Sequence, residues 1–191
     1  MIEIIDNLFC EDQQDKIEKL LINNNNFPYF YSLDTVDDEC KKHLPKDRRI
    51  GSQSQFCHLL YGDNKVNSRF FDEIFKYFKN KSIQNLTPHR IKVNLLFNNQ
   101  KNKNKFHTPH FDYPNNLGVS AIYYVSNSDG DTYFFNEEYN GSYPQKLTIY
   151  KKVTPKKGRV VLFNSNRFHS SSSPIKFESR CIINMVFLSN V

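Results

Sequence analysis

Arg180-Cys-Ile-Ile-Asn-Met-Val-Phe-Leu188 is an apolar run, rich in β-branched residues, near the end of a chain of 191 residues. A run of this kind predicts a strand. Similar short runs, separated by turn residues, precede it from Arg90 onward, and no internal repeat is visible. The predicted strands are Arg90–Phe97, about 107–113, Val119–Ser126, Asp131–Asn136, Leu147–Lys152, Arg159–Asn164 and Arg180–Ser189.

Two turn signals divide this series. Asp129-Gly130 is typical of a two-residue hairpin, and it predicts that the strands on either side pair with each other. Pro155-Lys-Lys-Gly158 predicts a turn that leads into the apolar Val160–Phe163.

The first third of the chain has a different pattern. Met1–Phe9 predicts a short strand, Glu11–Ile22 an amphipathic helix, and Lys65–Lys79 a helix whose aromatic and aliphatic residues recur every three or four positions. Ser32–Ser54 is polar and predicts a long surface excursion, which is either a lid or a disordered connector.

Short strands after a helical first third predict an α+β, mainly β fold: a double-stranded β-helix, or jelly-roll, of two facing antiparallel sheets braced by N-terminal helices. The length fits a single domain over 1–191. We expect 1–89 to supply helical support and a substrate loop, and 90–191 to form the jelly-roll catalytic core.

Composition limits the class of protein. The net charge is +6 and the sequence pI is about 9.0, which favours an anionic co-substrate or acidic partner and leaves nucleic acid open. No signal peptide or membrane span is evident, so we expect an intracellular, cytoplasmic protein. The four cysteines have no paired spacing and predict free thiols. The sequence does not indicate the oligomeric state.

His110-Phe111-Asp112 and the later His169 carry the chemistry. Residues two apart on a strand point to the same side, so His110 and Asp112 can both face the barrel interior. Two imidazoles and one carboxylate on one face of Fe(II) leave positions open for a chelating acid and for O2. The motif therefore predicts an iron-dependent oxygenase, with His110, Asp112 and His169 as metal ligands and catalytic centre.

Arg180 begins the last predicted strand and would lie inside the same barrel. An arginine cannot lose its proton to escape burial, and its planar fork suits a carboxylate. Arg180 is therefore the predicted anchor for an acidic co-substrate.

Four segments from about Arg90 to Leu188 resemble the Fe(II)- and 2-oxoglutarate-dependent dioxygenases, and within them the prolyl 4-hydroxylase-like branch. They are His107-Thr-Pro-His-Phe-Asp-Tyr113, Tyr123-Tyr-Val-Ser-Asn-Ser-Asp-Gly-Asp-Thr132, Val153-Thr-Pro-Lys-Lys-Gly-Arg-Val-Val-Leu-Phe163, and His169 with Pro174 and Arg180. The resemblance implies a double-stranded β-helix with Fe(II) on His110, Asp112 and His169. It also implies that 2-oxoglutarate chelates the iron and that its far carboxylate lies on Arg180.

The chain departs from relatives in this superfamily at three positions. Collagen-type prolyl hydroxylases usually have lysine where Arg180 stands, and tyrosine where His107 stands. Other branches have serine where this chain has Ile182. These departures weaken the transfer of a proline preference more than that of the co-substrate.

Further candidates lie around the predicted centre. His107 could hydrogen-bond co-substrate or substrate, or be a loop histidine; Asn94 could help hold a carboxylate, or form a turn. Thr132 and one of Tyr123 and Tyr124 are predicted pocket hydroxyls. Tyr124 is favoured because it shares parity with Thr132 across the predicted hairpin.

Three functions agree with the sequence. The first is a dioxygenase that hydroxylates an unactivated C–H bond, on a peptidyl residue such as proline, so that its partner is a peptide or protein. The second is a nucleic-acid dealkylating or hydroxylating oxygenase, which the charge favours but for which no base-reading element is evident. The third is a non-catalytic jelly-roll binding module. Substrate recognition is expected in the 32–55 excursion and the 98–106 loop.

Overall fold

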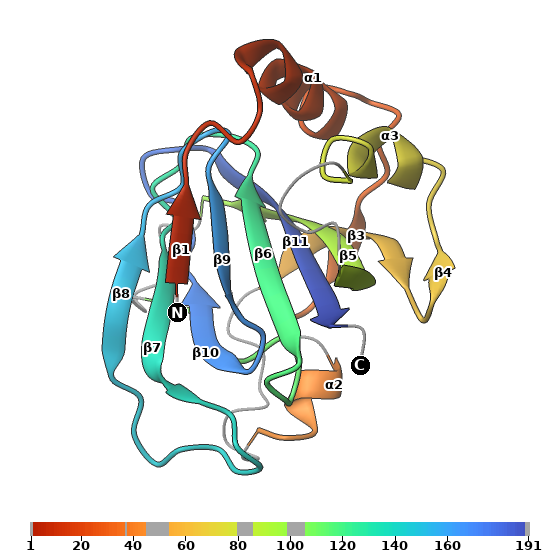
Figure 1. Cartoon of the computed structure of the whole chain (residues 1–191). Helices are drawn as coiled ribbons and strands as arrows, with labels where there is room; N and C mark the ends of the chain where they lie inside the picture. The colour runs from red at the N-terminus through yellow and green to blue at the C-terminus, as the bar shows by residue number, and fades with distance from the viewer. Residues whose placement is uncertain (1, 37, 45–53, 80–85, 99–105, 190–191) are drawn as a thin grey trace.

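The structure is a computed structural model that describes residues 2–36, 38–44, 54–79, 86–98 and 106–189 (Figure 1). Most of the predicted 98–106 loop and residues 45–53 of the predicted excursion lie outside the described residues.

Two antiparallel sheets form the body of the protein (Figure 1). The larger sheet has the strand order β1-β9-β6-β11-β5-β3-β2, with β4 paired to β3, and the smaller has the order β10-β7-β8. The strands are β1 Ile2–Ile5, β2 Phe30–Ser32, β3 Gln55–Gly62, β4 Lys65–Val66, β5 Leu86–Phe97, β6 Gly118–Tyr124, β7 Thr132–Glu138, β8 Ile149–Val153, β9 Val160–Asn164, β10 Arg167–Ser171 and β11 Ser179–Ser189. The helices are α1 Glu11–Leu21, α2 Asp38–Lys41 and α3 Phe71–Phe75.

The sheets face each other across a buried cluster that draws on both, including Ile122 and Ile182 from the larger sheet and Phe134 and Val153 from the smaller. The prediction of a mainly β jelly-roll with two facing sheets is therefore confirmed.

The central strands of the larger sheet divide their side chains by parity, because successive residues of a strand point to opposite faces. The odd-numbered residues from Ile91 to Leu95 of β5, from Ala121 to Tyr123 of β6 and from Cys181 to Phe187 of β11 face outward and pack with Ile17 and Leu21 of α1 and Phe71 and Ile74 of α3. The even-numbered Ile122, Tyr124 and Ile182 pack with residues of the smaller sheet. The outward set is Ile91, Val93, Leu95, Ala121, Tyr123, Cys181, Ile183, Met185 and Phe187.

The predicted strand at about 107–113 is wrong in its extent. Only His110 forms a β-bridge there, to His169 on β10. Pro109 has no backbone N–H, so it cannot donate to a continuous ladder beside β10.

The predicted hairpin at Asp129-Gly130 is also wrong, because β6 and β7 belong to different sheets. The Asp129 carboxylate instead accepts backbone N–H groups at 175–177, between 2.8 and 3.4 Å away. A side chain at Gly130 would place its Cβ 2.8 Å from Cδ of Arg180, so the glycine makes room for the arginine. The turn before Gly158, by contrast, is confirmed, with φ +78° at the glycine.

The predicted helix Lys65–Lys79 begins too early. Asp63 and Asn64 have φ values of 54° and 56°, which suit a tight hairpin turn, and Lys65–Val66 returns along β3 as β4. Regular helix begins only at Phe71.

Residues 1–89 contribute more than helices and a loop. The sequence did not predict β2 or β3, yet both extend the larger sheet beyond β5. Among the described residues, none of the helices is long and apolar enough to span a membrane.

Candidate metal centre

The chain brings His110 and His169 together through their backbones. The His110 amide donates to the His169 carbonyl at 2.9 Å, and the His169 amide donates to the His110 carbonyl at 2.8 Å. The ring centroids lie 4.6 Å apart. Asp112 is fixed beside them because its amide donates to the Ser165 carbonyl at 2.9 Å.

The three side chains form the one group among the described residues with the composition and spacing of a metal site. One ligand atom from each lies within 4.8 Å of the others, and Nε2 of His169 is 3.7 Å from Oδ2 of Asp112. The structure thus brings together the three residues predicted as ligands, although their roles as ligands remain a proposal.

Both imidazoles have one nitrogen held by the backbone. Nδ1 of His110 lies 3.1 Å from the Thr108 carbonyl, and Nδ1 of His169 lies 3.1 Å from the Arg167 carbonyl. A carbonyl only accepts, so each Nδ1 carries the proton and each Nε2 keeps its lone pair. This is the tautomer that a metal requires.

Asp112 is a buried carboxylate whose two oxygens both have partners. Oδ1 accepts from Arg90 at 2.7 Å and from Asn184 at 3.2 Å, and Oδ2 accepts from Ser120 at 2.7 Å. Burial alone would raise the pKa of Asp112, but the neighbouring His169, Arg90 and His110 and the Ser120 hydroxyl lower it below its ordinary value. The carboxylate is therefore ionised at neutral pH.

Arg180 is only 2% exposed and faces the same interior. Its Nε donates to the Gly130 carbonyl at 2.7 Å and its Nη2 to the Thr132 hydroxyl at 2.8 Å. Within the described part of the chain it forms no ion pair, and burial lowers its pKa. A buried guanidinium that forms no ion pair with the described residues is a suitable binding site for an anionic ligand.

Tyr124 and Thr132 lie beside this guanidinium. Their hydroxyls are 2.7 Å apart, and the Arg180 guanidinium carbon lies 5.7 Å from the Tyr124 ring centroid. Tyr123 points to the opposite face, into the outer core. Tyr124, unlike Tyr123, thus lies on the Arg180 side of the sheet, and its predicted role at the co-substrate site stays a prediction; the hairpin on which the choice rested does not exist.

His107 and Asn94 are placed differently. Both ring nitrogens of His107 face serine hydroxyls, Ser171 at 3.0 Å and Ser173 at 3.1 Å. Burial, followed by the charges of Arg180 and His110, lowers the pKa of His107 to about 3, so the ring is neutral. Its predicted contact with co-substrate or substrate stays a prediction. Asn94 lines the interior pocket directly.

The pocket extends from the three metal-binding candidates to Arg180 and encloses about 460 Å³, including space open to solvent. Several of its residues were missed by the sequence analysis, although even parity with Arg180 on β5 and β11 would have found those on these strands. The missed lining residues are Thr35, Gln55, Lys92, Leu96, Ile122, Ser171 and Asn184.

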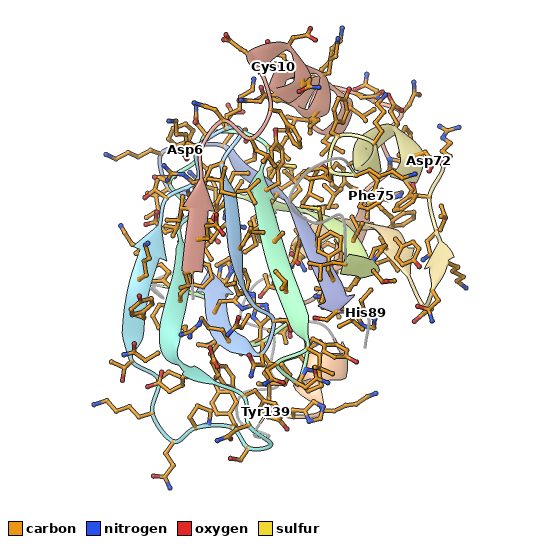
Figure 2. The ribbon with its side chains drawn as sticks, in the orientation of Figure 1. Asp6, Cys10, Asp72, Phe75, His89 and Tyr139 are labelled. Atoms are coloured by element: carbon orange, nitrogen blue, oxygen red, sulfur yellow. The ribbon has the colours of Figure 1, made fainter. Side chains whose placement is uncertain are left out.

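An open groove of about 1640 Å³, including space open to solvent, meets this pocket at Lys92 and Asp112. Its lining includes Leu59, His89 and Tyr113. Figure 2 labels His89 in the lower half of the view, far from Cys10 at the start of α1.

The donor set fits Fe(II). Two neutral imidazoles and one ionised carboxylate are the ligands typical of non-haem iron oxygenases, and the buried cation beside them fits a dicarboxylate such as 2-oxoglutarate.

Comparison with known proteins identifies the family of this core. Residues 95–188 match the family model described as the 2OG-Fe(II) oxygenase superfamily. No curated protein sequence matches the chain.

Solved structures share the fold at low identity. An oxidoreductase of the 2OG-Fe(II) oxygenase family from Burkholderia pseudomallei has a TM-score of 0.64 and 10% identity, covering 98% of this chain and 85% of that one. The alpha-ketoglutarate-dependent epimerase SnoN from nogalamycin biosynthesis has a TM-score of 0.61 and 12% identity, with coverage of 98% and 78%. A prolyl-4-hydroxylase from Pseudomonas putida has a TM-score of 0.55 and 11% identity, with coverage of 99% and 92%.

The matched segment contains His110, Asp112, His169 and Arg180, the four residues that define the centre. Through residues 95–188, this chain belongs to the 2OG-Fe(II) oxygenase superfamily.

Proposed function

We propose that the protein is a 2-oxoglutarate-dependent dioxygenase that hydroxylates an unactivated C–H bond of a peptidyl residue. Proline is the residue that the resemblance to prolyl 4-hydroxylases suggests. The observation that carries the proposal is the joint placement of two Nε2 lone pairs, one ionised carboxylate and one buried arginine around a single pocket.

In this proposal His110, Asp112 and His169 hold Fe(II), and Arg180 holds the far carboxylate of 2-oxoglutarate. When bound, the iron and 2-oxoglutarate supply with O2 the oxidation of C–H to C–OH, and 2-oxoglutarate leaves as succinate and CO2. The chain itself then binds the iron and 2-oxoglutarate, orients the substrate and excludes water.

The surrounding residues support these tasks. The carbonyls of Thr108 and Arg167 keep both imidazoles in the metal-binding tautomer. Arg90, Asn184 and Ser120 orient the Asp112 carboxylate. The apolar side chains of Leu96, Ile122 and Ile182 line the pocket and limit the entry of water.

The groove supports a peptide as the acceptor. It is open to solvent and joins the pocket at Lys92 and Asp112. An extended segment could lie in it and direct one side chain past Lys92 and Asp112 toward the metal.

The test is succinate release with Fe(II) and 2-oxoglutarate across a panel of peptides and oligonucleotides. We expect peptides to stimulate release and His110→Ala to abolish it, whereas His89→Ala, a histidine outside the three candidates, should still take up Fe(II). Stimulation by oligonucleotides with salt-sensitive binding would favour a nucleic-acid substrate instead. Turnover that survives His110→Ala would contradict the metal assignment.

A further inference from the structure

One wall of the pocket comes from outside the segment that matches the family. Thr35, Gln55, Lys92 and Asn94 line the pocket and precede residue 95. All four are polar, and the matched segment supplies the metal-binding candidates, Arg180, the apolar lining and the polar Thr132, Ser171 and Asn184. These four residues therefore belong to the pocket but not to the segment that matches the family model.

The segment that carries Thr35 is held by hydrogen bonds, an ion pair and apolar packing. The Gln55 side-chain amide donates to the Asp34 carbonyl at 3.0 Å, and the Asp34 carboxylate accepts the Val36 amide at 3.1 Å. Asp34 also pairs with Lys41 at 3.4 Å. Val36 and Cys40 pack in the cluster that contains Phe111, the residue between two metal-binding candidates. Residues 34–36 are thus fixed beside Gln55, which places Thr35 in the pocket lining.

Three polar atoms in the pocket lining lack a hydrogen-bond partner in the described structure: the Thr35 hydroxyl oxygen and the Oδ1 atoms of Asn94 and Asn184. The three residues are 8%, 9% and 6% exposed. Buried polar atoms are normally paired, so unpaired ones that share a pocket indicate a ligand that supplies the missing bonds.

The strand register places the two asparagines close together. Asn94 pairs with Ile182 and Asn184 pairs with Lys92, so they are diagonal neighbours on β5 and β11. The amide nitrogen of Asn184 already donates to Asp112, which turns its oxygen away from that carboxylate.

The hydrogen-bonding capacity of these atoms limits which ligands can bind to them. Amide oxygens only accept hydrogen bonds, and a dicarboxylate has no proton to donate to them. They need N–H or O–H donors. The Thr35 hydroxyl and the Lys92 ammonium, in the same lining, can donate to a carbonyl oxygen. A primary carboxamide carries two N–H donors and one carbonyl, whereas a prolyl ring carries none of these on its side chain.

We propose that Thr35, Asn94 and Asn184 form an acceptor subsite that selects a peptidyl side chain with N–H donors and a carbonyl, of the asparagine or glutamine type, over proline. This inference rests on the proposed hydroxylation of a peptidyl residue and replaces the suggested proline with a carboxamide residue. It makes Thr35 a specificity-determining residue supplied by the N-terminal third.

The first experiment compares host peptides that differ only at the central residue, asparagine, glutamine, proline or leucine, by succinate release with Fe(II) and 2-oxoglutarate. We expect kcat/KM to be at least about tenfold higher for a carboxamide peptide than for the proline peptide. Thr35→Val should remove most of that preference. Thr148→Val, the same change at an exposed site, should keep it.

A second measurement covers the case in which Thr35→Val damages the fold. Valine keeps the shape of threonine and removes a hydroxyl that has no partner, so the thermal midpoint should stay the same or rise. A fall of several degrees, relative to Thr148→Val, would show that the hydroxyl is structural and would overturn the subsite.

The other outcomes separate this inference from the proposed function. A preference for proline or leucine, or no stimulation by either carboxamide peptide while 2-oxoglutarate is still consumed, would overturn the subsite alone. Absence of Fe(II) uptake, or turnover that persists in His110→Ala, would overturn the proposed function itself.

Discussion

The two faces of the larger sheet differ although the same strands form both. On β5, Ile91, Val93 and Leu95 pack outward against the helices, while Lys92 and Asn94 between them line the pocket. On β11, Ile183 points outward and Arg180 and Asn184 point inward. Alternation along a strand therefore separates residues that stabilise the fold from residues that hold ligands.

This difference means that stability and turnover should respond to different substitutions. Outward residues gain free energy by burying apolar surface, so their loss should lower the free energy of unfolding. The inward Asn94 and Asn184 each keep a buried oxygen without a partner in the described structure, which stabilises the fold little, so their loss should mainly affect binding and turnover.

The largest effect is expected for His169→Ala. It removes one of three proposed metal ligands, and succinate release should fall by at least about 1,000-fold, or about 4 kcal/mol in transition-state stabilisation. Anaerobic Fe(II) titration of the same variant should show the loss of metal binding. Wild-type metal affinity in this variant would show that the site lies elsewhere.

The next effect is expected on the outward face. Ile183 is fully buried, and Ile183→Ala should lower the free energy of unfolding by about 3 kcal/mol, because it leaves a cavity in the outer core. Ile175→Ala, at a residue that is 65% exposed, is the matched control and should change it by less than about 0.5 kcal/mol. Denaturant unfolding measures the stability of both variants. Equal losses of stability would contradict the view that the outward face stabilises the fold.

Arg180→Met should act on binding. We expect the KM for 2-oxoglutarate to rise roughly 100-fold, equivalent to about 2.7 kcal/mol, because the variant loses a charge-assisted contact to a carboxylate. The free energy of unfolding should stay close to that of the wild type, since the buried guanidinium has no ion pair among the described residues. An unchanged KM would remove Arg180 from the co-substrate site.

A smaller effect is expected from pH. His107 has a pKa of about 3 in the folded protein and 6.5 as its ordinary value. Below pH 6.5 the unfolded chain therefore binds more protons, and stability falls as the pH falls toward 3. Between pH 6.5 and pH 5 this contribution is about 2 kcal/mol at most.

His107→Gln removes this titration, so its free energy of unfolding should depend less on pH over the same range. Urea unfolding at several pH values tests the difference between the two chains. Parallel pH profiles would show that His107 is not held neutral by the fold.

Much of the barrel could be predicted from the sequence because its strands carry strong local signals. The runs that became β5, β6, β9 and β11 are apolar and bounded by turn residues. Where local signals misled, a long-range contact decided the outcome: Asp129 binds the backbone of 175–177 instead of closing a hairpin, and β3 pairs with β4 where a helix was predicted.

The central residues of the site were predictable for a related reason. His110 and Asp112 are two apart, and His169 and Arg180 follow in the order that the resemblance requires. Thr35, Gln55 and Arg90 were not predictable, because they reach the pocket or Asp112 only through the pairing of β3 with β5 and the hydrogen bond from Gln55 to Asp34. Neither a helical nor a strand period in the sequence indicates contacts between segments so far apart.

The most direct test of the central claim is an experimental structure of the protein with Mn(II), as a redox-stable substitute for Fe(II), and 2-oxoglutarate. The prediction is one metal ion bound by Nε2 of His110, Nε2 of His169 and a carboxylate oxygen of Asp112, with the far carboxylate of 2-oxoglutarate on the Arg180 guanidinium. A metal ion held by other residues, or a 2-oxoglutarate that makes no contact with Arg180, would contradict the account.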